Sequence, residues 1–249
     1  MPSSPAAQRV AEQAIRLLKA SADERYRAGA SAYFKAYEDV RFYGVSAPRT
    51  KQIERVLFQT VCAGWTVKEA VACCDILIRY PQLEAKLVGI LLLARFKKQY
   101  EAGLLSKIES WLKGGYCNNW ATTDALCGYV FGFLLVEYPE LIGRVAKWTE
   151  AKHLYVRRSA AVSMLPVIRT GEYLDEAYAI AESLFDQPES LIHKATGWLL
   201  REAGKRDAAR LESFLLTHGP RIPRTALRYA IERFPETKRK KILAQTKAA

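Results

Sequence analysis

Glycine and proline are scarce in this chain, at 14 and 10 of 249 residues. Most of them stand between segments whose apolar residues recur every three or four positions, as at Val10, Ala14, Leu17 and Leu18. That spacing is typical of amphipathic helices, and the alternation that marks a β-strand is hard to find. The sequence therefore predicts an all-α protein.

Cysteine is also sparse, and the five residues are Cys62, Cys73, Cys74, Cys117 and Cys127. An odd number without a CxxC pair fits no disulfide framework, so we expect free thiols that pack as small apolar side chains in a reducing cytoplasm. The N-terminal residues 1–6 lack the apolar core of a signal peptide, and we expect them to form a flexible tail. The longest apolar run, residues 87–94, is too short to cross a membrane. We therefore expect a cytoplasmic protein without a membrane partner, associated with the nucleoid when it is on DNA.

Motifs for metals and cofactors are missing as well. The three histidines, His153, His193 and His218, are isolated and show no metal-ligand spacing. The chain contains no GxGxxG, no Walker A motif and no nucleophile elbow. We expect neither a metal nor a cofactor.

Positive charge, in contrast, is abundant. Lys and Arg number 38 against 26 Asp and Glu, which gives a formal net charge of +12. Such a surplus favours a polyanion, above all a nucleic acid, as the partner.

An internal repeat organises the helices. Residues 83–92 and 191–200 share Leu, Lys, Gly and a closing Leu-Leu, and the two segments are 108 residues apart, or three steps of 36. A period near 36 with paired helices is typical of an α-solenoid of HEAT or TPR type, here one domain over residues 1–249 with a concave basic groove. One column of the repeat contains Lys86, Arg158, Lys194 and Arg224, and a two-residue shift in a loop adds Asp124.

Asp124 is the single acid in this basic column. Trp120 precedes it by four residues and therefore shares its helix face, and Lys194 and Trp198 repeat that spacing. Taken singly, a Trp is usually a core residue, and Asp124 could simply neutralise Arg158. Taken together, a carboxylate that stabilises positive charge or activates water, beside indole faces, suits a substrate that is cationic in its transition state. Hydrolysis of the N-glycosidic bond of a cationic alkylated purine is such a reaction.

The chain resembles the AlkD family of HEAT-like-repeat alkylpurine DNA glycosylases. The resemblance is carried by the segments 42–49, 119–124, 155–161 and 194–202, which contain Gly44-Val45, Trp120-x-x-x-Asp124, Arg158 and Lys194-Ala195-Thr196-Gly197-Trp198. The chain departs from the family at Ala121, where members often have Asp, and the segment 33–38 aligns only loosely.

The resemblance implies an enzyme that excises N3- and N7-alkylated purines from double-stranded DNA without flipping the base. Asp124 would stabilise the oxocarbenium-like sugar and position water, Trp120 and Trp198 would pack on that sugar, and Arg158 would hold a phosphate. We expect further DNA contacts from Lys194, Arg157, Arg224, Arg228 and Lys86. We also expect a monomer without an obligate protein partner.

Two other readings stay open at this point. A non-catalytic HEAT-repeat protein could bind unusual or branched DNA, although a pure binder has no reason to place Asp124 in its phosphate track. A protein-binding scaffold would instead select acidic peptides and show no salt-sensitive affinity for DNA.

Overall fold

A computed structural model of the chain describes residues 4–35, 38 and 40–247. Within these ranges every regular element is helical, and the only β-type contact is an isolated bridge between Arg41 and Gln82. The all-α prediction is confirmed. No single helix of the described chain is long and apolar enough to span a membrane, and only the bent pair 120–137 and 139–150 reaches that length and apolarity together.

The chain forms two compact units, Met1–Leu134 and Leu135–Ala249. The division falls inside one short helix, α8 (Gly132–Glu137). Each unit buries apolar side chains of its own, for example Leu57 and Trp111 in the first and Leu199 and Leu215 in the second. A single domain over residues 1–249 stays a prediction.

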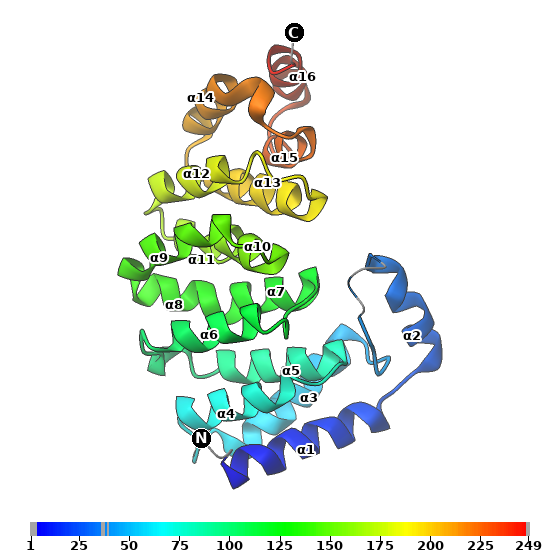
Figure 1. Ribbon diagram of the computed structural model, residues 1–249. Coiled ribbons are helices and arrows are strands. Elements are labelled where there is room, and N and C mark those ends of the chain that lie inside the picture. The colour runs from blue at the N-terminus through cyan, green and yellow to red at the C-terminus, as the bar shows by residue number, and fades with distance from the viewer. Residues whose placement is uncertain (1–3, 36–37, 39, 248–249) are drawn as a thin grey trace. The chain divides into compact units, whose positions relative to one another are not determined.

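Paired helices build the first unit. Its helices are α1 (Pro5–Ala20), α2 (Glu24–Ala30), α3 (Ala47–Val61), α4 (Val67–Leu77), α5 (Leu83–Ala94), α6 (Leu104–Lys113) and α7 (Trp120–Leu126). Helices α3 and α4 lie at about the same height, α5, α6 and α7 follow above them, and α2 stands off to their side (Figure 1). Helix α5 packs against α1, α3, α4 and α7, so it is the centre of this unit. Because α1 already begins at Pro5, the last two residues of the expected N-terminal tail are helical, and residues 1–3 lie outside the described part.

Side-chain caps define where several of these helices begin. Ser46 caps α3, whose first turn contains Pro48, and Thr66 forms a capping box with Glu69 at the start of α4. The backbone N–H of Thr66 donates to Glu69 Oε2 at 2.9 Å, which completes the box. These caps satisfy N–H groups that have no partner inside the helix. Ser46 and Thr66 thus fix where α3 and α4 begin.

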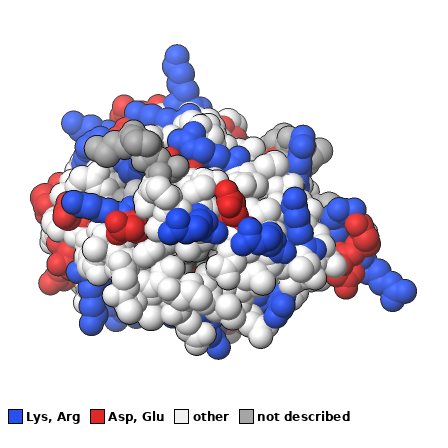
Figure 2. All heavy atoms as spheres, turned by 90° about the horizontal axis from the view of Figure 1, so that it is seen from below, with Lys and Arg blue, Asp and Glu red and all other residues white. Residues whose placement is uncertain are grey.

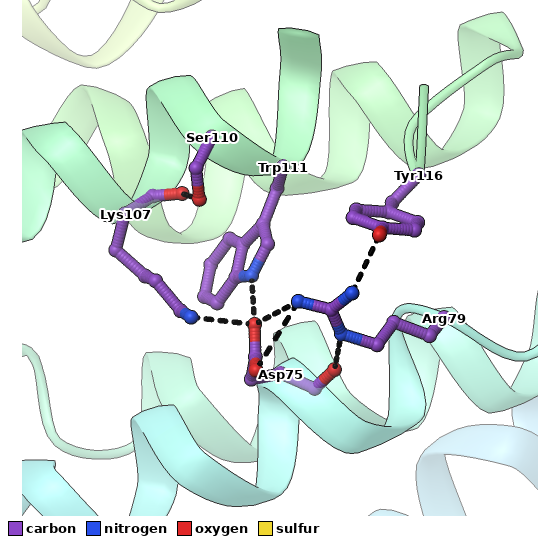
Figure 3. Close-up of polar contacts among 6 residues, drawn as sticks. All are labelled: Asp75, Arg79, Lys107, Ser110, Trp111 and Tyr116. Atoms are coloured by element: carbon purple, nitrogen blue, oxygen red, sulfur yellow. Dashed lines mark hydrogen bonds and ion pairs between the residues drawn. The ribbon is translucent and has the colours of Figure 1, made fainter. Parts of the chain in front are cut away.

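A polar cluster joins α4 to α6 and to the loop before α7. Asp75 on α4 accepts hydrogen bonds at 2.7 Å from Trp111 Nε1 and from Lys107 Nζ on α6 (Figure 3). Arg79 lies 4.4 Å above the ring of Tyr116 and donates to its hydroxyl. Burial raises the pKa of Asp75, but hydrogen bonds from Lys107 and Trp111 outweigh it, and the pKa lies below its ordinary value. The cluster therefore fixes the loop that leads into α7.

The second unit repeats the helix pairs. Its helices are α9 (Ile142–Ala146), α10 (Leu154–Val162), α11 (Met164–Ile168), α12 (Leu174–Ser183), α13 (Ser190–Gly204), α14 (Ala208–His218), α15 (Arg224–Ala230) and α16 (Glu236–Gln245). Helix α13 contacts α10, α12, α14 and α15 and is the centre of this unit. Gly197 makes the α13–α15 approach possible, since a Cβ at this position would lie 2.5 Å from the carbonyl oxygen of Ala226.

The predicted register appears in the helix bounds. Asp124, Arg158 and Lys194 are each the fifth residue of their helix, and Lys86 is the fourth residue of α5. Asp124 therefore has the same position in its helix as Arg158 and Lys194, as the two-residue shift in the sequence alignment assumed. Arg224 differs, because it is the first residue of α15.

Candidate active site

Helix α7 starts at Trp120 because two buried side chains accept hydrogen bonds from its first turn. Asn119 Oδ1 accepts from the backbone N–H of Thr122 at 2.9 Å. Glu38 Oε1 accepts from the backbone N–H of Trp120 at 2.9 Å. Glu38 is 1% exposed, and a carboxylate beside the first N–H groups of a helix interacts favourably with the helix dipole. Trp120 is therefore held at a defined place on the first unit.

The sequence of α7 separates an inner from an outer face. Thr122 and Thr123 are fully buried, and Thr123 Oγ1 donates to the carbonyl oxygen of Cys117 at 3.1 Å. Trp120, Ala121 and Asp124 are half-buried and lie on the other face. Trp120 and Asp124 therefore lie on one face of α7, as their four-residue spacing predicts.

A π-helical turn, Cys127–Phe131, follows α7 directly. Such turns add a residue to the helix and are frequent at functional sites. Here the turn lies immediately after the helix that carries Asp124.

One face of the Trp120 indole is covered. The Phe34 ring stacks on it with a centroid distance of 5.2 Å and an interplanar angle of 17°. Its Nε1 donates a long hydrogen bond of 3.4 Å to the carbonyl oxygen of Tyr33. Phe34 also contacts Phe42, with ring centroids 5.5 Å apart. A sugar that packs on Trp120 must therefore use the opposite indole face or the indole edge.

Beside Trp120 lies a cavity of about 560 Å³, which we refer to as the α2–α7 pocket. Its walls come from α2, the 3-10 turn Ser31–Tyr33, the segment before α3, and helices α3, α5 and α7. Aromatic rings dominate the lining, and those used below are Tyr26, Tyr33, Phe34, Phe42 and Trp120. Ala121 also lines the pocket, whereas Asp124 does not.

A buried carboxylate shapes one wall of this pocket. Glu84, 3% exposed, accepts three backbone hydrogen bonds, from Tyr43, Gly44 and Val45, at 3.0, 2.9 and 3.0 Å. Gly44 has φ +91°, and a Cβ there would lie 2.3 Å from the carbonyl oxygen of Asp23. The Gly44-Val45 pair noted in the sequence therefore builds a tight turn that Glu84 holds against α5.

All of the other predicted site residues except Lys86 belong to the second unit. Arg158 is 5% exposed and donates to the carbonyl oxygen of Leu191, and Arg157 donates to Glu189 and, at 2.7 Å, to the carbonyl oxygen of Ala151. The bonds to Leu191 and Glu189 tie α10 to the start of α13. Trp198 and Lys194 are half-buried on α13.

The remaining predicted DNA contacts differ in their surroundings. Lys86 is buried, its ammonium donates to the carbonyl oxygen of Tyr116, and burial lowers its pKa. A phosphate contact would require that bond to break. Arg224 donates to the carbonyl oxygens of Leu243 and Thr246 at 3.1 and 3.3 Å, so its guanidinium is held inside the second unit. Arg228 is exposed.

The surplus of positive charge is spread over the surface that Figure 2 draws. On that face, Lys and Arg stand at many separate places, with Asp and Glu between them and broad uncharged areas around them (Figure 2). The excess of cations is therefore not gathered into one patch on this side of the molecule.

The histidines have local roles. Burial, followed by the charge of Arg157, lowers the pKa of His153. His193 Nε2 lies 2.6 Å from the carbonyl oxygen of Gln187, and His218 Nδ1 lies 3.5 Å from Glu182. Among the described residues, no group of three or more His, Cys, Asp or Glu side chains could hold a metal ion.

Sequence reasoning missed three residues around α7. Glu38 and Phe34 lie in the loosely aligned segment 33–38, and Glu84 is 40 positions from its partner Gly44. The density of Tyr and Phe between residues 26 and 43 was a signal for an aromatic pocket. No sequence pattern indicated the partners of the two glutamates.

The fold and the site together define an all-α protein of paired helices that presents a Trp and an Asp on one helix face. A family model described as "DNA alkylation repair enzyme" matches residues 14–234. The chain belongs to this family of DNA alkylation repair enzymes, which implies DNA as its partner.

Comparison with solved structures gives the same fold. A predicted DNA alkylation repair enzyme from Enterococcus faecalis is similar to this chain with a TM-score of 0.75 and 17% sequence identity. The similarity covers 87% of this chain and 98% of that one. No curated protein matches the sequence.

Proposed function

We propose that the protein is a DNA glycosylase that hydrolyses the N-glycosidic bond of cationic N3- and N7-alkylated purines in duplex DNA. The observation that carries the proposal is the shared, half-buried face of Trp120 and Asp124 on α7. Family membership supports DNA as the substrate, and the residue types support this particular reaction.

The proposed chemistry follows from charge. When the bond to a cationic purine breaks, the base leaves as a neutral molecule and the sugar acquires oxocarbenium character. The Asp124 carboxylate stabilises that positive charge and orients the water that attacks the sugar. The indole face opposite Phe34, or the indole edge, packs against the sugar and adds a cation–π attraction. Neutral lesions lack the charge that favours departure and are expected to be poor substrates.

We further propose that hydrolysis needs no flipping of the lesion into a pocket at the carboxylate. In support, Asp124 does not line the α2–α7 pocket. Arg158, Lys194 and Trp198 are proposed to contribute further contacts to DNA.

Base release tests the catalytic assignment. Wild-type protein is incubated with methylated duplex DNA, and released 7-methylguanine and 3-methyladenine are quantified by chromatography. Asp124→Asn is expected to lower the rate by about 10²–10⁴, the usual contribution of a positioned acid or base, while duplex binding is retained. The control is Asp186→Asn, because the Asp186 side chain is 78% exposed and pairs with a surface residue, Arg221. Equal release by wild type and Asp124→Asn refutes the assignment.

DNA binding tests Arg158 separately. Arg158→Ala is expected to weaken duplex binding and to reduce the slope of affinity against salt concentration by about one released counterion. Because Arg158 also bonds to the Leu191 carbonyl, thermal unfolding of the same variant is measured in parallel. A variant that is less stable but keeps wild-type affinity and salt slope would make Arg158 a structural residue.

A further inference from the structure

The α2–α7 pocket has no role in the hydrolysis described above, yet its chemistry is that of a ligand site. Its volume of about 560 Å³ is within the range of small-molecule sites, roughly 300–1,000 Å³. All of its lining residues belong to the first unit. Trp120 is a wall of the pocket, and Asp124 lies one helical turn further along the same helix.

The walls present flat aromatic surfaces. Phe34 stacks on Trp120 at 5.2 Å, and Phe42 lies at a tilt of 56° to Phe34. Tyr26 and Tyr33 also line the pocket, and 44% and 79% of their surfaces are exposed to solvent. Large exposed apolar side chains concentrated at one place mark a binding site. A planar aromatic ligand would cover these rings.

The polar groups of the lining narrow the choice of ligand. Both oxygens of Glu84 already accept backbone hydrogen bonds, so this carboxylate does not require a cationic partner. The hydroxyl of Thr50 donates to the carbonyl oxygen of Ser46 at 3.1 Å. Arg25 adds N–H donors to the lining. Aromatic faces with guanidinium donors match a purine, which has two flat faces and hydrogen-bond acceptors on its edges, such as O6 of 7-methylguanine, whose N7 is blocked by the methyl group, or N7 of adenine.

We propose that the α2–α7 pocket binds a purine ring that is no longer stacked in DNA. The proposal rests on the proposed function for the identity of the ring, which would be the base that leaves after hydrolysis. Ala121 is part of the pocket wall, and its methyl group leaves that wall uncharged, whereas the Asp that family members often have at this position would add a negative charge.

Two variants test the pocket. Gly29 lines it, and a Cβ at Gly29 meets no atom within 4 Å, so Gly29→Trp can place an indole in the cavity without a clash at the backbone. Tyr26→Ala instead removes one exposed wall. The matched control is Gly143→Trp, since Gly143 is also an exposed helical glycine with open space around its Cβ, but it belongs to the second unit.

The first arm uses free 7-methylguanine and adenine as probes, titrated into the full chain by calorimetry. Wild type and Gly143→Trp are expected to bind both bases. Tyr26→Ala should weaken binding by about tenfold, the scale of one lost base–aromatic stack. Gly29→Trp should weaken it by at least as much, because the added indole occupies the space of the ligand. Failure of wild type to bind, or equal binding by all variants, overturns the proposal. Equal binding of N-acetyltryptophanamide would make the site a general aromatic pocket and would overturn its assignment to purines.

The second arm asks whether the ring can still be attached to DNA. A duplex with one unpaired adenine is compared with the fully paired duplex. If wild type binds the duplex with the unpaired adenine more tightly and Gly29→Trp abolishes this preference, the pocket accepts a ring that is still attached to DNA. If wild type binds both duplexes with equal affinity, the pocket accepts the released base alone. Base release separates this inference from the proposed function. If wild type releases methylated bases from DNA but does not bind free base, the pocket proposal is refuted and the proposed function stands. If wild type binds free base but releases none from DNA, the proposed function is refuted and the pocket still binds purines.

Discussion

The bond network of Glu84 gives the sharpest prediction of stability. In Glu84→Gln the side chain keeps its shape but loses its charge and one acceptor atom. The remaining carbonyl oxygen can accept from Gly44 and Val45, and the new NH₂ group then faces the backbone N–H of Tyr43. One hydrogen bond to a charged group, worth about 1.5–3 kcal/mol, is lost, and two others weaken by about 1 kcal/mol each. The expected loss is about 3.5–5 kcal/mol in the free energy of unfolding of the first unit.

Amide hydrogen exchange measures this effect locally, which matters because two compact units need not unfold in one step. The amides of Tyr43, Gly44 and Val45 should lose protection in Glu84→Gln, and denaturant unfolding of the first unit should shift in parallel. Glu101→Gln is the control, because Glu101 is exposed and such changes stay within about 0.5 kcal/mol. Unchanged protection at the three amides would show that the carboxylate does not hold this turn.

Three further predictions concern packing, pH and thiol chemistry. Gly197→Ala should destabilise the second unit by about 1–3 kcal/mol or more, because the new Cβ would lie 2.5 Å from the Ala226 carbonyl oxygen. Gly143→Ala is the control, since a Cβ at Gly143 meets open space and should stabilise its helix by up to about 1 kcal/mol. Denaturant unfolding curves of the two variants and wild type measure both effects. The pKa of Asp75 is lowered in the folded state, so its contribution to stability is complete above about pH 4 and is lost as the pH falls through the lowered value. Acid unfolding of Asp75→Asn should therefore depend less on pH than that of wild type, and identical pH profiles would contradict the assignment. Cys62 is exposed and the other four cysteines are buried, so a thiol reagent should titrate one group in the native protein and five after denaturation; fast reaction of a second thiol would show that the core opens.

The glycine that recurs in the sequence repeat packs against a different helix in each unit. Gly89 and Gly197 occupy equivalent positions in the two similar segments. A Cβ at Gly89 would lie 2.9 Å from the Cβ of Leu77 on α4, whereas one at Gly197 would meet Ala226 on α15. Both glycines therefore allow a close helix contact, but the neighbouring helix differs, α4 in the first unit and α15 in the second.

The sequence by itself determined the helical fold class, the helix on which Asp124 lies, and the face that it shares with Trp120. These features depend on local spacing, since apolar periodicity and N-terminal caps act within a few residues of one another. The sequence alone predicts these features because the interactions concerned are short-range along the chain.

Only the tertiary structure decided what surrounds that face. Glu38 reaches the first N–H of α7 from 82 positions away, and Glu84 holds a turn 40 positions before it. Phe34 covers one side of Trp120, and the ammonium of Lys86, expected on the surface, is buried against the carbonyl oxygen of Tyr116. Contacts of this kind arise when distant segments pack to remove apolar surface from water and to pair the polar groups that are buried with it, and no local pattern specifies them.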